Sequence, residues 1–333
     1  MNQKLKLIGV GVVSVLALGI AALTTTTSAQ NAKTLVIVLG GSPSDTFWTA
    51  VSRGAKDAGK AMLAYGGSVE YLGPKNYDNF GPDMARLNQT ALARKPAAVV
   101  SANWLPGSQT PGLAAISKAG IPLFLYNTGT ATMKADGALK YVGTDEKLAG
   151  EVAGKAFIEA GVKNVICVNT VPGAINLETR CNGVKEGLES GGGTAKTLQL
   201  PSSTFGNPSS VTQAIKGALI SDAKIDGIIT VGTSTGDYAF EAIKGADKEG
   251  KVKLSTFDIS VPTIQRVLDG QMLFAVDQQP YLQGFYAATM AFQYAKWGLL
   301  PANNAILTGP LLVTKQNAAK VLEGAKAGIR GAN

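Results

Sequence analysis

Short apolar runs alternate with longer amphipathic segments from Lys33 onward. One amphipathic segment, 47–63, carries apolar residues at steps of three and four, which places them on one helix face: Phe47, Val51, Ala55, Ala58 and Met62. This alternation is typical of parallel sheets with helices on both faces, so we predict an α/β fold of doubly wound parallel sheets. The pattern predicts strands at 34–39, 68–71, 97–101, 122–126, 141–142, 164–168, 195–198, 227–231, 253–257 and 273–276.

The chain is long enough for two domains, with 333 residues, yet no low-complexity linker follows Ala32. Positions 131–143 hold a short strand where a long helix would fit the alternation, and we place the first crossing between two lobes there. Lobes without a linker must be joined by strands or short hinges. We therefore expect them to share a cleft, which is a favoured place for a ligand.

The first residues have the pattern of a secretory signal. Lys4 and Lys6 precede an apolar run at 7–23, and small residues lead to Ala29. We expect a signal peptide over residues 1–29 that is cleaved after Ala29, rather than a permanent membrane anchor. Because no cysteine closely follows the run, we do not expect a lipoprotein. The protein is predicted to be exported and to work outside the cytoplasm.

Composition removes several classes of function. The chain has no histidine, which excludes Ser-His-Asp and Cys-His nucleophiles and histidine-ligated metals. Its two cysteines are too few for a four-cysteine zinc site, so we expect no metal. The net charge of +8 comes from scattered lysines without aromatic interleaving, so we expect no nucleic-acid partner. A binding protein is favoured over an enzyme.

The two cysteines, Cys167 and Cys181, lie in the part predicted to be exported, where disulfides are stable. A bridge across a loop of about 15 residues would contribute roughly 3 kcal/mol to stability. A disulfide and a pair of buried thiols both fit this spacing.

Two glycine-containing stretches imitate a phosphate-binding loop. They begin at Gly54 and Gly245, and both lack the closing Ser or Thr that would hold magnesium. The first also falls inside a predicted helix, and the second links a helix to a strand, the reverse of the required order. We therefore predict no nucleotide and no other cofactor.

Polar residues follow the ends of most predicted strands. In doubly wound sheets, ligands bind beyond these carboxyl ends. The strand-end residues include Asn103 with Trp104, Asn127 with Thr128, Thr233 with Thr235, Asp258, and Asp277 with Gln278. Amides, hydroxyls and carboxylates without an activated nucleophile suit hydrogen bonds to a neutral polyhydroxy ligand.

The loop after the first strand delivers Asp45, Phe47 and Trp48 to the start of the first helix. A carboxylate beside aromatic rings suits a sugar, because the acid accepts hydroxyl hydrogen bonds and a ring covers the C–H face. The alternative is that Asp45 caps the helix while the aromatic rings fill the core. Arg180 adds a planar set of donors able to hold two adjacent oxygens, unless an ion pair uses them.

Taken together, residues 33–320 resemble the ribose-type, or type I, family of periplasmic sugar-binding proteins of ABC transporters. The resemblance rests on the order of six motifs: Asp45-Thr46-Phe47-Trp48, Gly120-Ile121-Pro122 before Asn127, Val142-Gly143-Thr144-Asp145, Arg180-Cys181-Asn182-Gly183, Thr256-Phe257-Asp258 and Asp277-Gln278-Gln279-Pro280.

The resemblance implies two lobes joined by three hinge strands, near Gly143, Gln278 and Leu311. It places 30–143 with 279–310 in the N-terminal lobe and 144–278 with 311–333 in the C-terminal lobe. The ligand-binding residues that it implies are Asp45, Phe47, Trp48, Asn103 and Asn127 in the first lobe, Arg180, Thr235 and Asp258 in the second, and Gln278 at a hinge.

The resemblance also implies a mechanism. A monosaccharide or polyol binds one lobe, the other rotates onto it, and the closed form delivers the ligand to a membrane permease with its ATPase. A chemoreceptor is a further possible partner, and a monomer is expected. The family often has Asp-Arg where this chain has Asn127-Thr128, and Asn where it has Thr235, so ribose itself is disfavoured.

Two other classes of protein share parts of this pattern. An exported carbohydrate-active enzyme could use paired carboxylates such as Asp45 and Asp258. The ligand-binding core of a repressor-like regulator shares this fold, but it would need a DNA-binding segment where this chain has its signal-like sequence.

Overall fold

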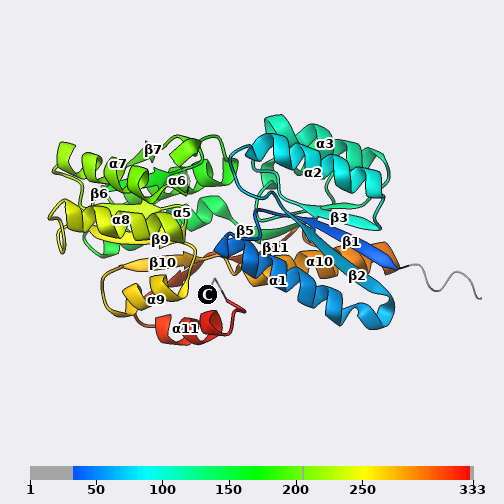
Figure 1. Cartoon of the computed structure of the whole chain (residues 1–333). Coiled ribbons are helices and arrows are strands. Elements are labelled where there is room, and N and C mark those ends of the chain that lie inside the picture. The colour runs from blue at the N-terminus through cyan, green and yellow to red at the C-terminus, as the bar shows by residue number, and fades with distance from the viewer. Residues whose placement is uncertain (1–32, 205, 331–333) are drawn as a thin grey trace, which may run out of the picture. The chain divides into compact units, whose positions relative to one another are not determined.

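The computed structural model describes residues 33–204 and 206–330, and these residues form two α/β lobes (Figure 1). The predicted signal peptide lies outside the described residues. The first lobe is built on a parallel six-stranded sheet with the order β11-β5-β4-β3-β1-β2. Its strands are β1 Thr34–Leu39, β2 Gly67–Leu72, β3 Ala98–Ser101, β4 Leu123–Tyr126, β5 Tyr141–Thr144 and β11 Ala305–Gly309.

The second lobe has a six-stranded sheet with the order β12-β10-β9-β8-β6-β7, in which only the edge strand β12 runs antiparallel. Its strands are β6 Asn164–Asn169, β7 Thr194–Gln199, β8 Gly227–Thr230, β9 Lys253–Phe257, β10 Phe274–Asp277 and β12 Leu311–Val313. The prediction of two doubly wound lobes is confirmed.

Helices cover both faces of each sheet. On the first sheet α1 packs against α10 and α2 packs against α3; on the second, α5 packs against α6 and α7 against α8 (Figure 1). The helices are α1 Thr46–Ala61, α2 Phe80–Arg94, α3 Pro106–Lys118, α4 Met133–Asp136, α5 Glu146–Glu159, α6 Ile175–Glu189, α7 Pro208–Ser221, α8 Thr233–Gly245, α9 Val261–Leu268, α10 Pro280–Trp297 and α11 Ala318–Lys326. The stretch that begins at Gly54 lies inside α1, as expected, so its amides belong to the helix.

Alternation along β6 shows why both faces of a sheet must be covered. Ile166 and Val168 belong to the hydrophobic cluster on one face, and Val165 and Cys167 belong to the cluster on the other. Side chains of a strand point alternately to opposite faces, so a strand that is apolar throughout needs helices on both.

The cysteines are bridged. Cys167 of β6 and Cys181 of α6 form a disulfide with Cα atoms 5.6 Å apart. The bridge fixes α6 to β6, the strand beside the edge strand β7, immediately after Arg180.

The chain passes between the two sheets three times. It crosses after β5, after β10, and between β11 and β12 at the cis peptide bond Gly309–Pro310. Among the described residues, no helix combines the length and apolar character that a bilayer crossing requires.

Candidate functional site

A cavity of about 440 Å³ is lined by residues of both lobes, at the carboxyl ends of their strands. This is the size range of small-molecule sites in proteins. A backbone hydrogen bond joins the lobes at its rim, where the amide of Ile175 at the start of α6 donates to the carbonyl of Trp104 at 3.1 Å. An orphan N–H group of a helix end in one lobe therefore finds its acceptor in the other.

Aromatic rings from the first lobe form one wall of the cavity. Trp48 lies edge-on to Phe47 at 5.0 Å and to Trp104 at 5.2 Å, measured between ring centroids. Phe80 lies 5.2 Å from Trp104, and Tyr77 lies 5.3 Å from Phe80. All five line the cavity. Such a wall presents rigid apolar surface to the C–H faces of a ring-shaped ligand.

Asp45 caps the first helix, which is the alternative to ligand binding given for it in the sequence analysis. Its Oδ1 accepts the amide of Phe47 at 2.9 Å and so caps α1, while its Oδ2 accepts the hydroxyl of Tyr77 at 2.9 Å. The residue also lines the cavity. Burial raises the pKa of this carboxyl, although the two hydrogen bonds oppose the shift.

Asn127 follows β4 with its backbone in the left-handed region, at φ 61°. Its Oδ1 accepts Trp104 Nε1 at 3.1 Å, and its Nδ2 donates to Gln283 Oε1 at 3.3 Å. These bonds fix the amide at the cavity wall, where it is 2% exposed.

Asn103 differs from the prediction. It is fully buried outside the set of residues that line the cavity, and its Nδ2 donates to the two carboxylate oxygens of Asp136 at 3.0 and 2.9 Å. The side-chain amide is thus held by Asp136, the last residue of α4. Its neighbour Trp104 reaches the cavity in its place.

The second lobe contributes polar groups from strand ends and helix starts. Asp258 follows β9 at φ 68°, and Thr235 lies in the first turn of α8; both line the cavity. Burial raises the pKa of Asp258 to about 7, and the opposing effects of Arg180 and a hydrogen bond from Gln278 do not cancel the rise. Gln278, next to the second crossing, donates to the Asp258 carboxylate.

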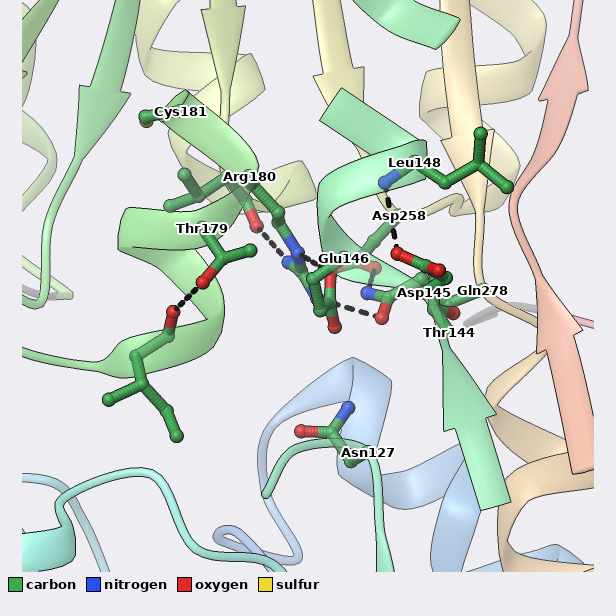
Figure 2. A network of polar contacts seen from close by, with 12 residues as sticks. Asn127, Thr144, Asp145, Glu146, Leu148, Thr179, Arg180, Cys181, Asp258 and Gln278 are labelled. Carbon is green, nitrogen blue, oxygen red and sulfur yellow. Dashed lines mark hydrogen bonds and ion pairs between the residues drawn. The ribbon is translucent and has the colours of Figure 1, made fainter. Parts of the chain in front are cut away.

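Arg180 projects from α6 into a buried polar network (Figure 2). Its Nε and Nη2 donate to the two carboxylate oxygens of Glu146 at 2.5 and 2.9 Å, and Nη2 also donates to Gln278 Oε1 at 2.7 Å. The ion-pair alternative for Arg180 is therefore realised. The N–H donors of Arg180 were expected to hold two oxygens of a ligand. Most of them instead form hydrogen bonds to groups of the protein itself.

Two buried polar atoms in the wall lack a partner among the described residues. They are Thr170 Oγ1 and Asn176 Oδ1, and both residues line the cavity. A buried polar group without a hydrogen bond costs about 1–3 kcal/mol, so a ligand that supplies the partner is favoured.

These two residues, together with Tyr77 and Phe80, line the cavity but were not predicted from the sequence. Thr170 directly follows β6, so the strand-end rule could have found it. Asn176 lies in the first turn of α6, Tyr77 lies in the connection between β2 and α2, and Phe80 is the first residue of α2. None of these three residues directly follows a strand, so the strand-end rule could not have found them.

The chain matches the model of a known protein family. The match covers residues 36–299, and the family is described as periplasmic binding protein domain. A carbohydrate transporter from Acidothermus cellulolyticus, crystallised with myo-inositol, is 31% identical, with a TM-score of 0.80 over 89% of this chain and 99% of that chain. A solute-binding protein from Actinobacillus succinogenes with bound D-allose is 21% identical at a TM-score of 0.74, covering 86% of this chain and 100% of that one, and supports the fold alone.

A curated relative is more distant. The xylose/arabinose-binding protein of Sulfolobus acidocaldarius is 27% identical over 214 residues, which span 60% of this chain and 52% of that protein. The chain thus matches about half the length of this relative.

Proposed function

Because this chain belongs to the periplasmic binding protein family, we propose that it is the solute-binding component of an ABC importer and that it captures a neutral monosaccharide or cyclic polyol. The signal-like sequence supports release into the periplasm after cleavage at Ala29. The closed protein then delivers its ligand to a membrane permease and its ATPase. It carries out no covalent chemistry.

The observation that carries this proposal is the unpartnered pair in the cavity wall, Thr170 Oγ1 and Asn176 Oδ1. The aromatic wall, which comes from the first lobe, offers apolar surface in the same cavity. A ligand that fits both must combine C–H faces with several hydroxyl groups, as sugars and inositols do. The crystal structure of the 31% identical transporter with myo-inositol makes this cyclitol the first candidate.

The proposed site consists of Asp45, Phe47, Trp48, Asn127, Arg180, Thr235, Asp258 and Gln278 from the predicted set, joined by Tyr77, Phe80, Trp104, Thr170 and Asn176. We place the lobe boundaries at the three crossings, with 30–143 and 279–310 in one lobe and 144–278 and 311–333 in the other.

Hinge closure provides selectivity. A hydroxyl that meets no partner in the closed cavity is buried at a cost, so a mismatched sugar is rejected. Closure also requires flexible joints, and the three crossings supply them.

The proposal is tested by calorimetry on the purified protein, unfolded and refolded to remove any bound ligand. The titrants are myo-inositol, D-allose, D-xylose, L-arabinose, D-glucose, linear polyols and amino acids. One neutral sugar or polyol is expected to bind at one site. At about 1,000 times its dissociation constant it should raise the free energy of unfolding by roughly 4 kcal/mol.

Two results would overturn this function. One is that an amino acid binds and none of the sugars or polyols does. The other is recovery of a chemically altered ligand from the bound complex, which would indicate an enzyme.

A further inference from the structure

Arg180 is the cation in the wall of the cavity, and the protein occupies most of its hydrogen-bonding capacity. A guanidinium has five N–H donors. Four of them have acceptors among the described residues: the two oxygens of Glu146, Gln278 Oε1, and the carbonyl of Val231, which Nη1 reaches at 3.2 Å. The Phe257 ring covers one face of the group, 5.0 Å from its carbon. One Nη1 hydrogen remains for a ligand.

Glu146 accepts two of the hydrogen bonds that Arg180 donates. It is the first residue of α5, immediately after the first crossing, and it is 9% exposed. It does not belong to the residues that line the cavity. Figure 2 shows its carboxylate facing the guanidinium from the neighbouring helix. Any effect of Glu146 on a ligand therefore acts through Arg180.

The charges that face the cavity favour a neutral ligand. Its charged lining residues are Asp45, Asp78, Asp258 and Arg180 in the described part of the chain. With Glu146 bound to Arg180, the one positive charge among the described lining residues is compensated before any ligand enters. A carboxylate or phosphate on the ligand would meet carboxylates without a free bidentate partner.

We propose that Glu146 determines the ligand selectivity of this cavity: by holding Arg180 through two hydrogen bonds, it reserves the site for neutral polyhydroxy ligands and excludes sugar acids and sugar phosphates. Glu146 is thus a positioning residue. The inference rests on the function proposed above and deepens it, because it names the charge class of the ligand.

The test compares the wild type with Glu146→Gln, which keeps the side-chain size and removes the charge. The probes are neutral and acidic partners of one ring: D-glucose with D-glucuronate, D-galactose with D-galacturonate, and myo-inositol with myo-inositol 1-phosphate. Glu159→Gln is the matched control, because Glu159 is the exposed last residue of the same helix.

The wild type and Glu159→Gln are expected to bind the neutral member of a pair at least tenfold more tightly than the acid. Glu146→Gln frees a donor and leaves Arg180 uncompensated. Its preference for the neutral member should shrink by about tenfold or more, the range of a hydrogen bond to a charged group. An unchanged preference in a variant that still binds the neutral ligand overturns the inference and leaves the proposed function intact.

A second measurement does not depend on which sugar is bound. The midpoint of thermal unfolding is followed with increasing D-glucuronate, against chloride at equal ionic strength. Glu146→Gln should be stabilised specifically by D-glucuronate and the wild type should not. If no neutral sugar binds the wild type, the proposed function fails, and this measurement alone decides the inference.

Loss of Glu146 leaves a buried guanidinium partly unpaired, which can prevent folding. Glu146→Asp is therefore the second variant, because it keeps the charge and shortens the side chain by one methylene. It should move the preference in the same direction by a smaller factor. Failure of both variants to fold would assign Glu146 to lobe stability alone and overturn the inference.

Discussion

Two cavity residues hold the left-handed backbone conformation that most residues avoid, Asn127 at φ 61° and Asp258 at φ 68°. Asn and Asp tolerate this region better than other non-glycine residues, because their short polar side chains form local hydrogen bonds. Each sits at the end of a strand, and the turn directs its side chain into the cavity wall. Backbone strain at these two positions thus coincides with the polar groups offered to a ligand.

The carboxyl of Asp258 gives the unliganded protein a specific pH dependence. Burial raises its pKa from 3.8 to about 7, so folding favours the protonated form. Stability from this group is fully present below the pKa of the unfolded chain and is lost as the pH rises through about 7. Urea unfolding from about pH 4 to pH 8 should show the wild type losing stability relative to Asp258→Asn, and parallel curves would contradict this.

Strand ends could be read from the sequence, whereas the partners of their side chains could not. Asn127 and Asp258 were predicted because a polar residue follows a buried strand, and both line the cavity. The same rule selected Asn103, which does not line it, because its amide donates to Asp136 from a distant segment. The ion pair between Arg180 and Glu146 could not be predicted from the sequence either. The two residues are 34 positions apart and meet only because α5 packs on α6.

At the scale of elements, each lobe contains one helix pair that packs through glycine. A Cβ atom at Gly54 in α1 would lie 2.0 Å from the carbonyl oxygen of Tyr281 in α10, and one at Gly154 in α5 would lie 2.4 Å from that of Val184 in α6. These glycines let two backbones touch. The α5·α6 pair holds Glu146 against Arg180, so its spacing also sets the geometry of the network in Figure 2.

Gly154→Ala should therefore destabilise the protein. The added methyl group meets backbone atoms, which cannot rotate away, and overpacking of this kind costs about 1–3 kcal/mol. Gly217→Ala is the matched control in the interior of α7, where a Cβ atom meets nothing within 4 Å. It should stabilise by about 0.5–1 kcal/mol. Urea unfolding measures both, and equal effects would contradict the proposed contact.

The strands that the hydrophobic pattern missed are the edge strands β11 and β12. An edge strand is half exposed, and Leu307 of β11 and Leu311 of β12 are exposed apolar residues. Their apolar runs, 305–307 and 311–313, are three residues long, and runs this short cannot be assigned to a strand by pattern alone. The resemblance to a family indicated a hinge near Leu311, where residue pattern alone gave no signal.

At the scale of the whole molecule, the last described residues form hydrogen bonds next to the second crossing. Arg330 Nε donates to Oδ2 of Asp277 at 2.8 Å, and this carboxylate at the end of β10 is fully buried. The carbonyl of Gly328 accepts a hydrogen bond from Arg53 of α1. A segment that follows a helix of the second lobe therefore contacts the first lobe beside a hinge.

Arg330→Ala should lower the free energy of unfolding by about 2 kcal/mol, because it leaves a buried carboxylate without its charged partner. Adding Asp277→Asn should restore part of the loss, since the amide oxygen can still accept from the amide of Gln279 as Oδ1 does now. A double-mutant cycle in urea measures the coupling. Strictly additive effects of the two substitutions would show that the pair is not coupled.

The three crossings also set the order in which a newly made chain can fold. The first lobe needs α10, which packs on α1, and β11, while the second needs β12 and α11; all four lie at or after residue 280. During synthesis, both lobes therefore stay incomplete until residues beyond 280 have emerged from the ribosome. This late completion fits the export proposed above, because a chain whose lobes are incomplete can still be threaded through a membrane pore.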